Sequence, residues 1–155
     1  MTHQNPSQND IRDLLTEAQT VAMVGASSRD NRPSYGIFRK LQAAGYRVIP
    51  VNPHEKEVLG EKAYATLDEV PVPIDIVDVF RRSDDTPPIA DDAVRVGAKT
   101  LWLQLGISSE DAAQRAKAGG LTVVMDLCIS TAHSVLEVPK KKKSAKGSGA
   151  QDPVR

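Results

Sequence analysis

The stretch TVAMVGASSRDNRPSYGIFRKLQAAGYRVIPVNP, residues 20–53, decides the fold of this protein. It contains an apolar run, a loop of small and charged residues, an amphipathic stretch with helical spacing, and a second apolar run. This order predicts a strand, a helix and a second strand parallel to the first. The loop has Gly25 and then no glycine before Gly36, whereas dinucleotide-binding loops follow G-x-G-x-x-G. The other loop residues must therefore indicate what the loop holds.

The rest of the chain continues the alternation of strand and helix. We expect strands over residues 21–24, 46–51, 74–80, 100–105 and 121–125. We expect helices after an Asp10 cap, over 34–44, from a Thr86 cap to Gly97, from a Ser108 cap to Gly119 and around His133, with one helical turn at 66–70. This pattern predicts the α/β class, with a Rossmann-like five-stranded parallel sheet in order 3-2-1-4-5 and helices on both faces. Strands one and four would then flank the ligand crevice.

Length and composition predict one domain. The 155 residues suffice for a single core, and we expect it to span 10–138, between a flexible N-terminus (1–9) and a disordered basic tail (139–155). The only cysteine, Cys128, excludes an intramolecular disulfide framework and fits a reducing compartment. No apolar run approaches the roughly 18–20 residues of a membrane span, and the N-terminus lacks a signal-peptide pattern. We therefore expect a cytoplasmic protein.

The net charge of zero hides an uneven distribution. Residues 140–155 contain six basic residues and one acidic residue, so this tail carries +5 and the remainder carries −5. The tail has no apolar periodicity, which is typical of a solvated, disordered segment, although its charge could also attract nucleic acid or anionic lipid weakly. The acidic body and the 4% aromatic content argue against nucleic acid as the main partner.

The loop after the first strand has the chemistry of a phosphate site. Gly25 permits a tight turn, and the next three residues are small enough for the backbone to approach a ligand. Their N–H groups and hydroxyls can donate to phosphate oxygens, Arg29 and Arg32 add positive charge, and the following helix presents its N-terminus to an anion. The predicted phosphate loop consists of Gly25, Ala26, Ser27, Ser28, Arg29, Pro33 and Ser34.

The corner after the second strand discriminates among nucleotides. An NAD site usually has an acid at this strand end for the ribose 2′-hydroxyl. Here the strand ends in Val51 and is followed by Asn52, Pro53 and His54, with Lys56 nearby. A neutral and basic corner favours an extra phosphate on the ribose, which leaves NADP and coenzyme A as the candidates.

Five segments together resemble the small stand-alone CoA-binding proteins, whose fold is similar to that of the CoA-binding domain of the succinyl-CoA synthetase α subunit. The segments are residues 21–53, VLGEKAYATLDEVP, IDIVDVFRR, GAKTLWLQLGI and LTVVMDLCI, and the resemblance extends over about residues 10–136. It implies that 26–29 contact the pyrophosphate, with Pro33 and Ser34 on its far side, and that 52–56 lie near the 3′-phosphate. It also implies that Phe80 and Arg81 flank the adenine, and that Gln104, Leu105, Gly106 and Ile107 follow the pantetheine arm.

One segment departs from that family. Relatives commonly read Asp-Arg-Cys-Ile-Lys after the last strand, whereas this chain has Asp126, Leu127, Cys128, Ile129 and Ser130. Two basic residues are therefore absent, and a role of those cations in holding an acyl carboxylate does not carry over.

A binding module is favoured over a catalyst. No hydrolase elbow G-x-S-x-G and no set of metal ligands is present, since Cys128 and His133 alone are too few. Asp126, Cys128 and His133 could form a reactive-thiol site, or Cys128 could simply pack beneath the last helix. The sequence thus predicts a protein that binds coenzyme A or an acyl-CoA without catalysis of its own. The alternatives are a small NADP-dependent oxidoreductase and a nucleotide-binding subunit of a larger acyl-CoA ligase.

Overall fold

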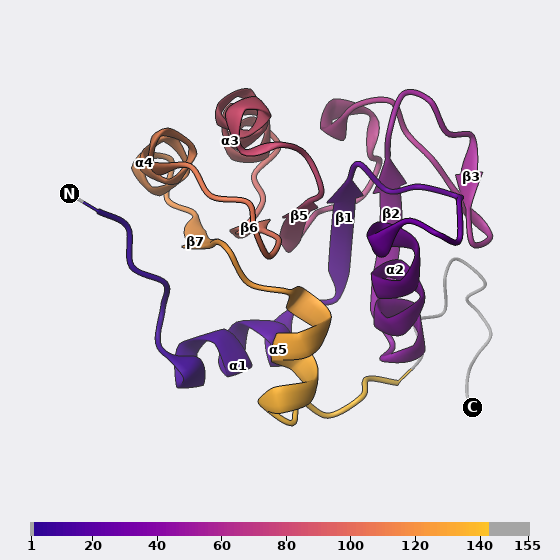
Figure 1. The fold of residues 1–155 in the computed structure, drawn as a ribbon, viewed down its shortest axis with the longest axis horizontal. Helices are drawn as coiled ribbons and strands as arrows, with labels where there is room; N and C mark the ends of the chain where they lie inside the picture. The colour runs from indigo at the N-terminus through magenta and orange to yellow at the C-terminus, as the bar shows by residue number, and fades with distance from the viewer. Residues whose placement is uncertain (1, 143–155) are drawn as a thin grey trace.

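A computed structural model describes residues 2–142 and contains a five-stranded parallel sheet with helices on both faces (Figure 1). The strands of this sheet are β1 (Thr20–Val24), β2 (Arg47–Val51), β5 (Ile76–Val79), β6 (Thr100–Leu103) and β7 (Thr122–Val124). The helices are α1 (Gln8–Glu17), α2 (Pro33–Ala43), α3 (Thr86–Arg95), α4 (Glu110–Ala118) and α5 (Ile129–Val135). The predicted fold class is therefore confirmed.

Short elements fill the connections on both sides of β5. A two-stranded antiparallel hairpin, β3 (Glu57–Val58) with β4 (Glu61–Lys62), follows β2, and the 3-10 helix η1 (Leu67–Glu69) occupies the expected helical turn. A second 3-10 helix, η2 (Ser83–Asp85), leads into α3. The hairpin has only two residues in each strand, too few for a period-2 pattern to predict it.

Two hydrophobic cores lie on opposite faces of the sheet. One core contains apolar residues of α1, α2 and α5, including Leu15, Phe38 and Ile129. The other contains the alanines of α3 and α4, such as Ala90 and Ala113, whose small side chains let these helices approach the sheet closely. Successive residues of a strand point to opposite faces, so each strand contributes to both cores.

The strand order is β2-β1-β5-β6-β7, which is 2-1-3-4-5 in the numbering of the sequence prediction, so the predicted order 3-2-1-4-5 was wrong. The outer edge of β2 is occupied, because Tyr64 N donates to Pro50 O and Asn52 N donates to Tyr64 O. Pro50 has no N–H on that side, which suits an edge strand and not a central one. The third strand therefore pairs with β1, and the switch point lies between β1 and β5.

Three predicted helix caps differ by a few residues from the observed ones. The side chain of Ser7, not Asp10, caps α1 by accepting from Asp10 N, and Ser109, not Ser108, caps α4 by accepting from Ala112 N. Thr86 is the first residue of α3 and not its cap, because η2 precedes the helix directly. In these three helices the observed N-cap residues, Ser7, Asp85 and Ser109, stand within three residues of the predicted ones, which are also of capping type, so composition alone could not select among them.

Both chain ends contact the folded body where they are described. In the segment expected to be flexible, Asn5 Nδ2 donates to Met125 O and Met125 N donates to Asn5 Oδ1, both at 2.9 Å. In the expected basic tail, Lys141 N donates to Ala44 O at 2.8 Å and Lys141 Nζ donates to Thr16 O at 2.6 Å. The rest of that predicted tail, 143–155, lies outside the described residues. Within residues 2–142, no helix has the length and apolarity to cross a membrane.

Candidate functional site

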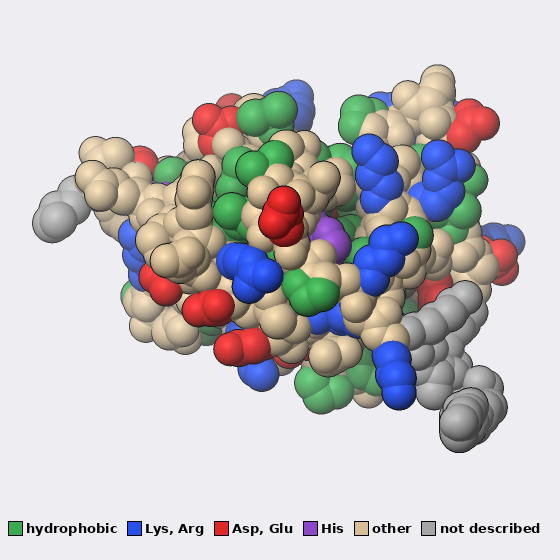
Figure 2. All heavy atoms as spheres, turned by 90° about the horizontal axis from the view of Figure 1, so that it is seen from below, with side chains coloured by type: hydrophobic (Ala, Val, Ile, Leu, Met, Phe, Trp, Pro, Cys, Tyr) green, Lys and Arg blue, Asp and Glu red, His purple; other side chains and the backbone are tan. Residues whose placement is uncertain are grey.

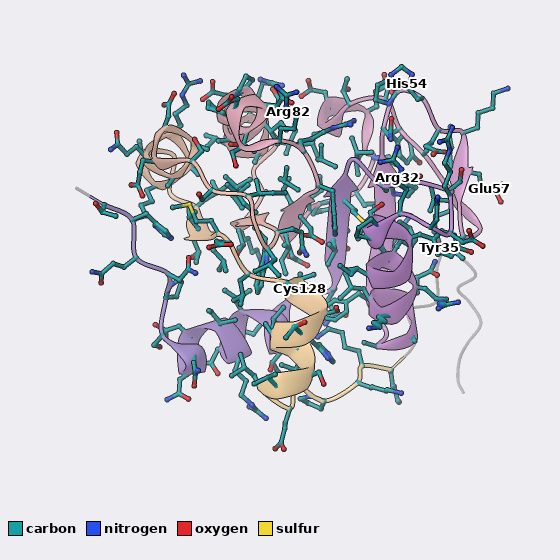
Figure 3. The ribbon with its side chains drawn as sticks, in the orientation of Figure 1. Arg32, Tyr35, His54, Glu57, Arg82 and Cys128 are labelled. Carbon is teal, nitrogen blue, oxygen red and sulfur yellow. The ribbon has the colours of Figure 1, made fainter. Side chains whose placement is uncertain are left out.

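A cavity of about 620 Å³ opens where β1, β2 and β5 end. Its size falls within the usual range for small-molecule sites. Figure 3 shows Arg32 and His54 at this end of the molecule, with Arg82 on the side of α3. The cavity is lined by Gly25, Ser27, Arg29, Arg32, Pro33, Ser34, Asn52, His54, Glu55, Phe80, Arg81, Arg82 and Ile107.

Gly25 directly follows β1 and lies between the ends of β2 and β5. Its N–H donates to Val51 O at 2.9 Å, and Phe80 N donates to Val24 O at 2.8 Å. Its φ is +91°, and a Cβ at this position would lie 2.5 Å from Phe80 O. Only glycine fits here without moving backbone. The single glycine of the loop is therefore required by the packing of β1 against its neighbours.

Side chains from α2 and from the β2 corner hold the backbone of the loop. Asn52 is buried, and its Nδ2 donates to Ala26 O at 2.9 Å. Ser34, also buried, accepts from Ser27 N at 3.2 Å through its hydroxyl. These bonds fix the path of the loop across the start of α2, whose N-cap residue, Arg32, makes no side-chain cap. Pro33 has no N–H and Tyr35 N donates to Arg32 O at 3.0 Å, so the first turn offers an anion mainly the positive end of the helix dipole.

The charges around the cavity favour a polyanion. Arg29, Arg32, Arg81 and Arg82 line it from two loops, one after β1 and one after β5. Arg82 forms one ion pair, with Asp85 at 3.9 Å, but both side chains are more than half exposed, and such a pair contributes little. Guanidinium groups donate in a fixed fork that matches phosphate oxygens.

Glu55 is the single acid among the described residues that line the cavity. Its carboxylate accepts from Ser28 N at 2.9 Å, and this backbone hydrogen bond is the main cause that lowers the pKa of Glu55 below its usual value. The carboxylate therefore occupies one of the donors that the loop would offer to a phosphate. The sequence argument looked for an acid at the end of β2 itself and overlooked this one, four residues beyond it.

Ten of the 17 predicted site residues line the cavity, and seven do not. Ala26 is buried under the loop, and Ser28, Pro53 and Lys56 are exposed outside the cavity wall. The sequence had also missed Arg82 and Glu55, and it had named Arg32 only for its charge. The pair of arginines directly after the β5 pattern was the available signal for Arg82.

The segment after β6, residues 104–107, is bonded to the residues around the start of α5. In the corrected order Gly25 faces Phe80, so Gln104, Leu105 and Gly106 do not lie across the crevice from it. Gln104 is buried and its Oε1 accepts from Ile129 N, while Gly106 N donates to Asp126 Oδ1 at 2.7 Å. Leu105 is 68% exposed, and of this segment Ile107 alone is among the described residues lining the cavity. The segment leads from β6 toward α4, and these two hydrogen bonds hold it against the start of α5.

Cys128 does not share a site with the two polar residues that the sequence grouped with it. Asp126 accepts from Gly106, and the ring of His133 packs edge-on against Tyr46 at 5.8 Å between centroids. His133 lines a separate hollow of about 260 Å³ between α2 and α5, with Lys40 and Lys140 on its wall. Burial lowers the pKa of His133, and the nearby charges of Lys141 and Lys140 lower it further.

The face of the molecule seen from below is also divided by charge. Figure 2 shows Lys and Arg side chains gathered toward its right half, with Asp and Glu more frequent toward its left half.

Across the described residues, no group of three or more His, Cys, Asp and Glu side chains gathers as a metal ion would require.

Comparison with known proteins identifies relatives along nearly the whole fold. The family described as CoA binding domain matches residues 19–134. The uncharacterized protein YneT of Bacillus subtilis (strain 168) is 46% identical over 132 residues, which are 85% of this chain and 98% of YneT. The α subunit of ADP-forming acetate–CoA ligase II of Pyrococcus furiosus is 35% identical over 65 residues, which are 41% of this chain but only 14% of that subunit.

A solved structure agrees with these sequence matches. The hypothetical protein from Pyrococcus horikoshii OT3 superposes with a TM-score of 0.83 at 33% identity, covering 88% of this chain and 99% of that one. The fold of this chain is therefore shared with a protein of similar size.

Proposed function

This chain belongs to the family of CoA binding domains, and from that premise we propose that it binds coenzyme A or an acyl-CoA in the cavity at the ends of β1, β2 and β5. The observation that carries the proposal is the set of four arginines around an uncapped helix start and a glycine turn. Coenzyme A has a pyrophosphate and a 3′-phosphate, so it needs cations in two places. Arg29 and Arg32 would bind one group, and Arg81 and Arg82 are available to the other.

The rest of the ligand would follow the apolar part of the cavity wall. Phe80 would lie against the adenine, and Ile107 would contact the pantetheine arm, which is long and only weakly polar. His54, whose N–H donates to Asn52 Oδ1 at 2.9 Å, would stand beside the ribose and its 3′-phosphate. In this arrangement the protein binds and presents its ligand, and we assign it no catalytic step of its own.

A nucleotide-binding role within a larger acyl-CoA ligase is a second candidate. It is favoured by the likeness to the ligase subunit of Pyrococcus furiosus, of which this chain spans about one seventh. In that role the chain would still hold coenzyme A and would depend on a partner for the chemistry. The two candidates therefore share the site and differ in what surrounds it.

Titration calorimetry with coenzyme A, 3′-dephospho-CoA and NADP tests the proposal. We expect micromolar or tighter binding of coenzyme A. Charge-assisted contacts with phosphate are worth about 1.5–3 kcal/mol, so loss of the 3′-phosphate should weaken binding about tenfold or more. Mass spectrometry of small molecules released from the purified protein provides an independent measurement, in which a CoA mass is expected.

Two results would contradict the proposal. Binding of NADP as tight as that of coenzyme A would favour the oxidoreductase alternative. Equal affinity for coenzyme A and its 3′-dephospho form would show that the site does not bind the 3′-phosphate.

A further inference from the structure

Asp78 is an unusual residue in the centre of the sheet. It lies on β5, is completely buried, and neither of its carboxyl oxygens has a hydrogen-bond partner among the described residues. An unpaired carboxylate is costly in an apolar interior, so the group is expected to be neutral. Burial raises the pKa of Asp78 well above its usual value, and the charge of Cys128 raises it further. Nothing in the proposed CoA site uses this side chain.

The strand register places Asp78 on the face that Cys128 covers. Asp78 pairs in register with Met23 and Trp102, which belong to the core on the α5 side, whereas its neighbours Val77 and Val79 belong to the opposite core. Trp102 Nε1 donates to the carbonyl of Leu127 at 2.8 Å, which fastens the segment containing Cys128 to this face.

The environment of Cys128 favours its thiolate. The residue is half-buried at the start of α5, where Figure 3 labels it, and its Sγ lies 3.4 Å from Ser130 Oγ. Burial acts to raise the pKa of the Cys128 thiol, but hydrogen bonds from Ser130 and Thr131 outweigh it and bring the pKa to about 7.

The other residues packed near Asp78 and Cys128 either carry no charge or make contacts with residues outside this pair. Met23 and Trp102, on either side of Asp78, carry no charge. Asp126 is engaged by Gly106, and His133 and Lys141 contact Tyr46. Cys128 is thus the charged group that acts on Asp78 within the described residues.

We propose that Cys128 is a site of reversible thiolation by the disulfide of a low-molecular-weight thiol, with Asp78 as a neutral acid in the layer beneath it. The Cys128 thiolate attacks one sulfur of the disulfide, a bond from Cys128 Sγ to that sulfur forms, and the old sulfur–sulfur bond breaks. The other half leaves as a thiolate with the electron pair and takes a proton from water. Asp78 is a positioning residue: it makes no hydrogen bond to the sulfur, and because it is neutral it places no opposing negative charge on the face of the sheet that Cys128 covers.

Intact-mass spectrometry after incubation with CoA disulfide or with cystamine tests the reaction. Both reagents supply the same exchange chemistry, but only CoA disulfide can use the proposed CoA site, so that arm alone rests on the proposed function. We expect one adduct per chain, absent in Cys128→Ser and removed by dithiothreitol. Faster modification by CoA disulfide identifies coenzyme A as the source, and equal rates identify small disulfides in general. No adduct from either reagent, while Cys128 labels readily in denaturant, would overturn the proposal whether or not coenzyme A binds.

The pH dependence of alkylation by iodoacetamide tests the roles of the neighbours. We expect a midpoint near pH 7, at which about half of Cys128 is thiolate, against about 3% for an ordinary thiol with a pKa of about 8.5. Ser130→Ala should raise the midpoint and slow alkylation at pH 7 several-fold. Ser134→Ala, an exposed serine on the same helix, is the matched control and should leave both unchanged.

Two substitutions separate a neutral Asp78 from an ionised one. Asp78→Asn and Asp78→Ala both replace the carboxyl by an uncharged group, so both should preserve the midpoint if Asp78 is already neutral. A lower midpoint in Asp78→Asn would mean that an ionised carboxylate opposes the thiolate, and it would overturn the role assigned to Asp78.

Because either variant could be poorly folded, the infrared absorption of the protonated carboxylic acid in the unaltered protein at pH 7 provides a second measurement. Its absence would overturn that role as well.

Discussion

Glu55 and Arg29 illustrate how single side chains set the affinity of the cavity. Both line it, with opposite charge, and they belong to loops that are brought together by the parallel pairing of β1 and β2. The carboxylate of Glu55 accepts from the N–H of Ser28. In the proposed site, a phosphate that uses this donor would have to displace the carboxylate.

Arg29→Ala should weaken coenzyme A binding about tenfold or more, because a charge-assisted hydrogen bond to phosphate is worth about 1.5–3 kcal/mol. Titration calorimetry measures the change. Arg39→Ala removes the same charge from an exposed position on α2 outside the cavity and should have little effect. Equal affinities for the two variants would exclude Arg29 from the site.

Glu55→Gln should tighten coenzyme A binding about fivefold at low salt. Two unit charges about 4 Å apart interact by about 1 kcal/mol even in bulk water, and the amide removes that repulsion. Glu57→Gln, on the exposed strand β3, changes the net charge equally and serves as the control. Weaker binding in Glu55→Gln would show instead that the carboxylate accepts a hydrogen bond from the ligand.

At the scale of elements, α2 and the turn before it decide how closely a ligand can approach the sheet. The turn passes between the ends of β2 and β5, and α2 begins without a side-chain cap. The elements after β2 also close the outer edge of that strand, which directs the third strand to the other side of β1.

Gly25→Ala should lower both the stability of the fold and the affinity for coenzyme A. The new Cβ would lie 2.5 Å from Phe80 O, and the positive φ alone costs about 1–2 kcal/mol in a residue with a side chain. Thermal unfolding and calorimetry measure the two effects. Gly36→Ala on α2 is the control, since its Cβ would contact nothing within 4 Å and should stabilise the helix by about 0.5–1 kcal/mol. A Gly25→Ala protein as stable as the unaltered one would contradict the tight packing described for this turn.

At the scale of the whole molecule, the chain ends contribute to the fold from opposite sides. Asn5 is hydrogen-bonded to Met125, directly after the last strand. Lys141 joins the end of α2 to α1 by donating to Ala44 O and Thr16 O. The Nζ of Lys141 also lies 4.8 Å from the ring centroid of Tyr46. The predicted domain, 10–138, leaves both Asn5 and Lys141 outside, so its two boundaries separate these contacts from the body.

Two truncations test the C-terminal boundary. Deleting 143–155 should leave the melting temperature and the coenzyme A affinity unchanged. Deleting 140–155 also removes the Lys141 contacts, which are worth about 1 kcal/mol each, and a change of 1 kcal/mol shifts the melting temperature by about 2–4 °C in a domain of this size. Equal melting temperatures for the two truncations, measured by calorimetry or circular dichroism, would show that Lys141 does not stabilise the body.

The sequence by itself determined the class of fold, the order along the chain of the five sheet strands and the five helices, and the position of the glycine turn after the first strand. These follow from local periodicity and from turn and helix-start chemistry near Gly25 and Pro33, which neighbouring residues specify. Only the tertiary structure decided which strand pairs with β1, although Pro50 already indicated that β2 lies at an edge. It also brought Glu55 to Ser28 and placed Asp78 beneath Cys128. Such contacts between distant segments depend on strand register and on crossover connections, which the local sequence does not specify.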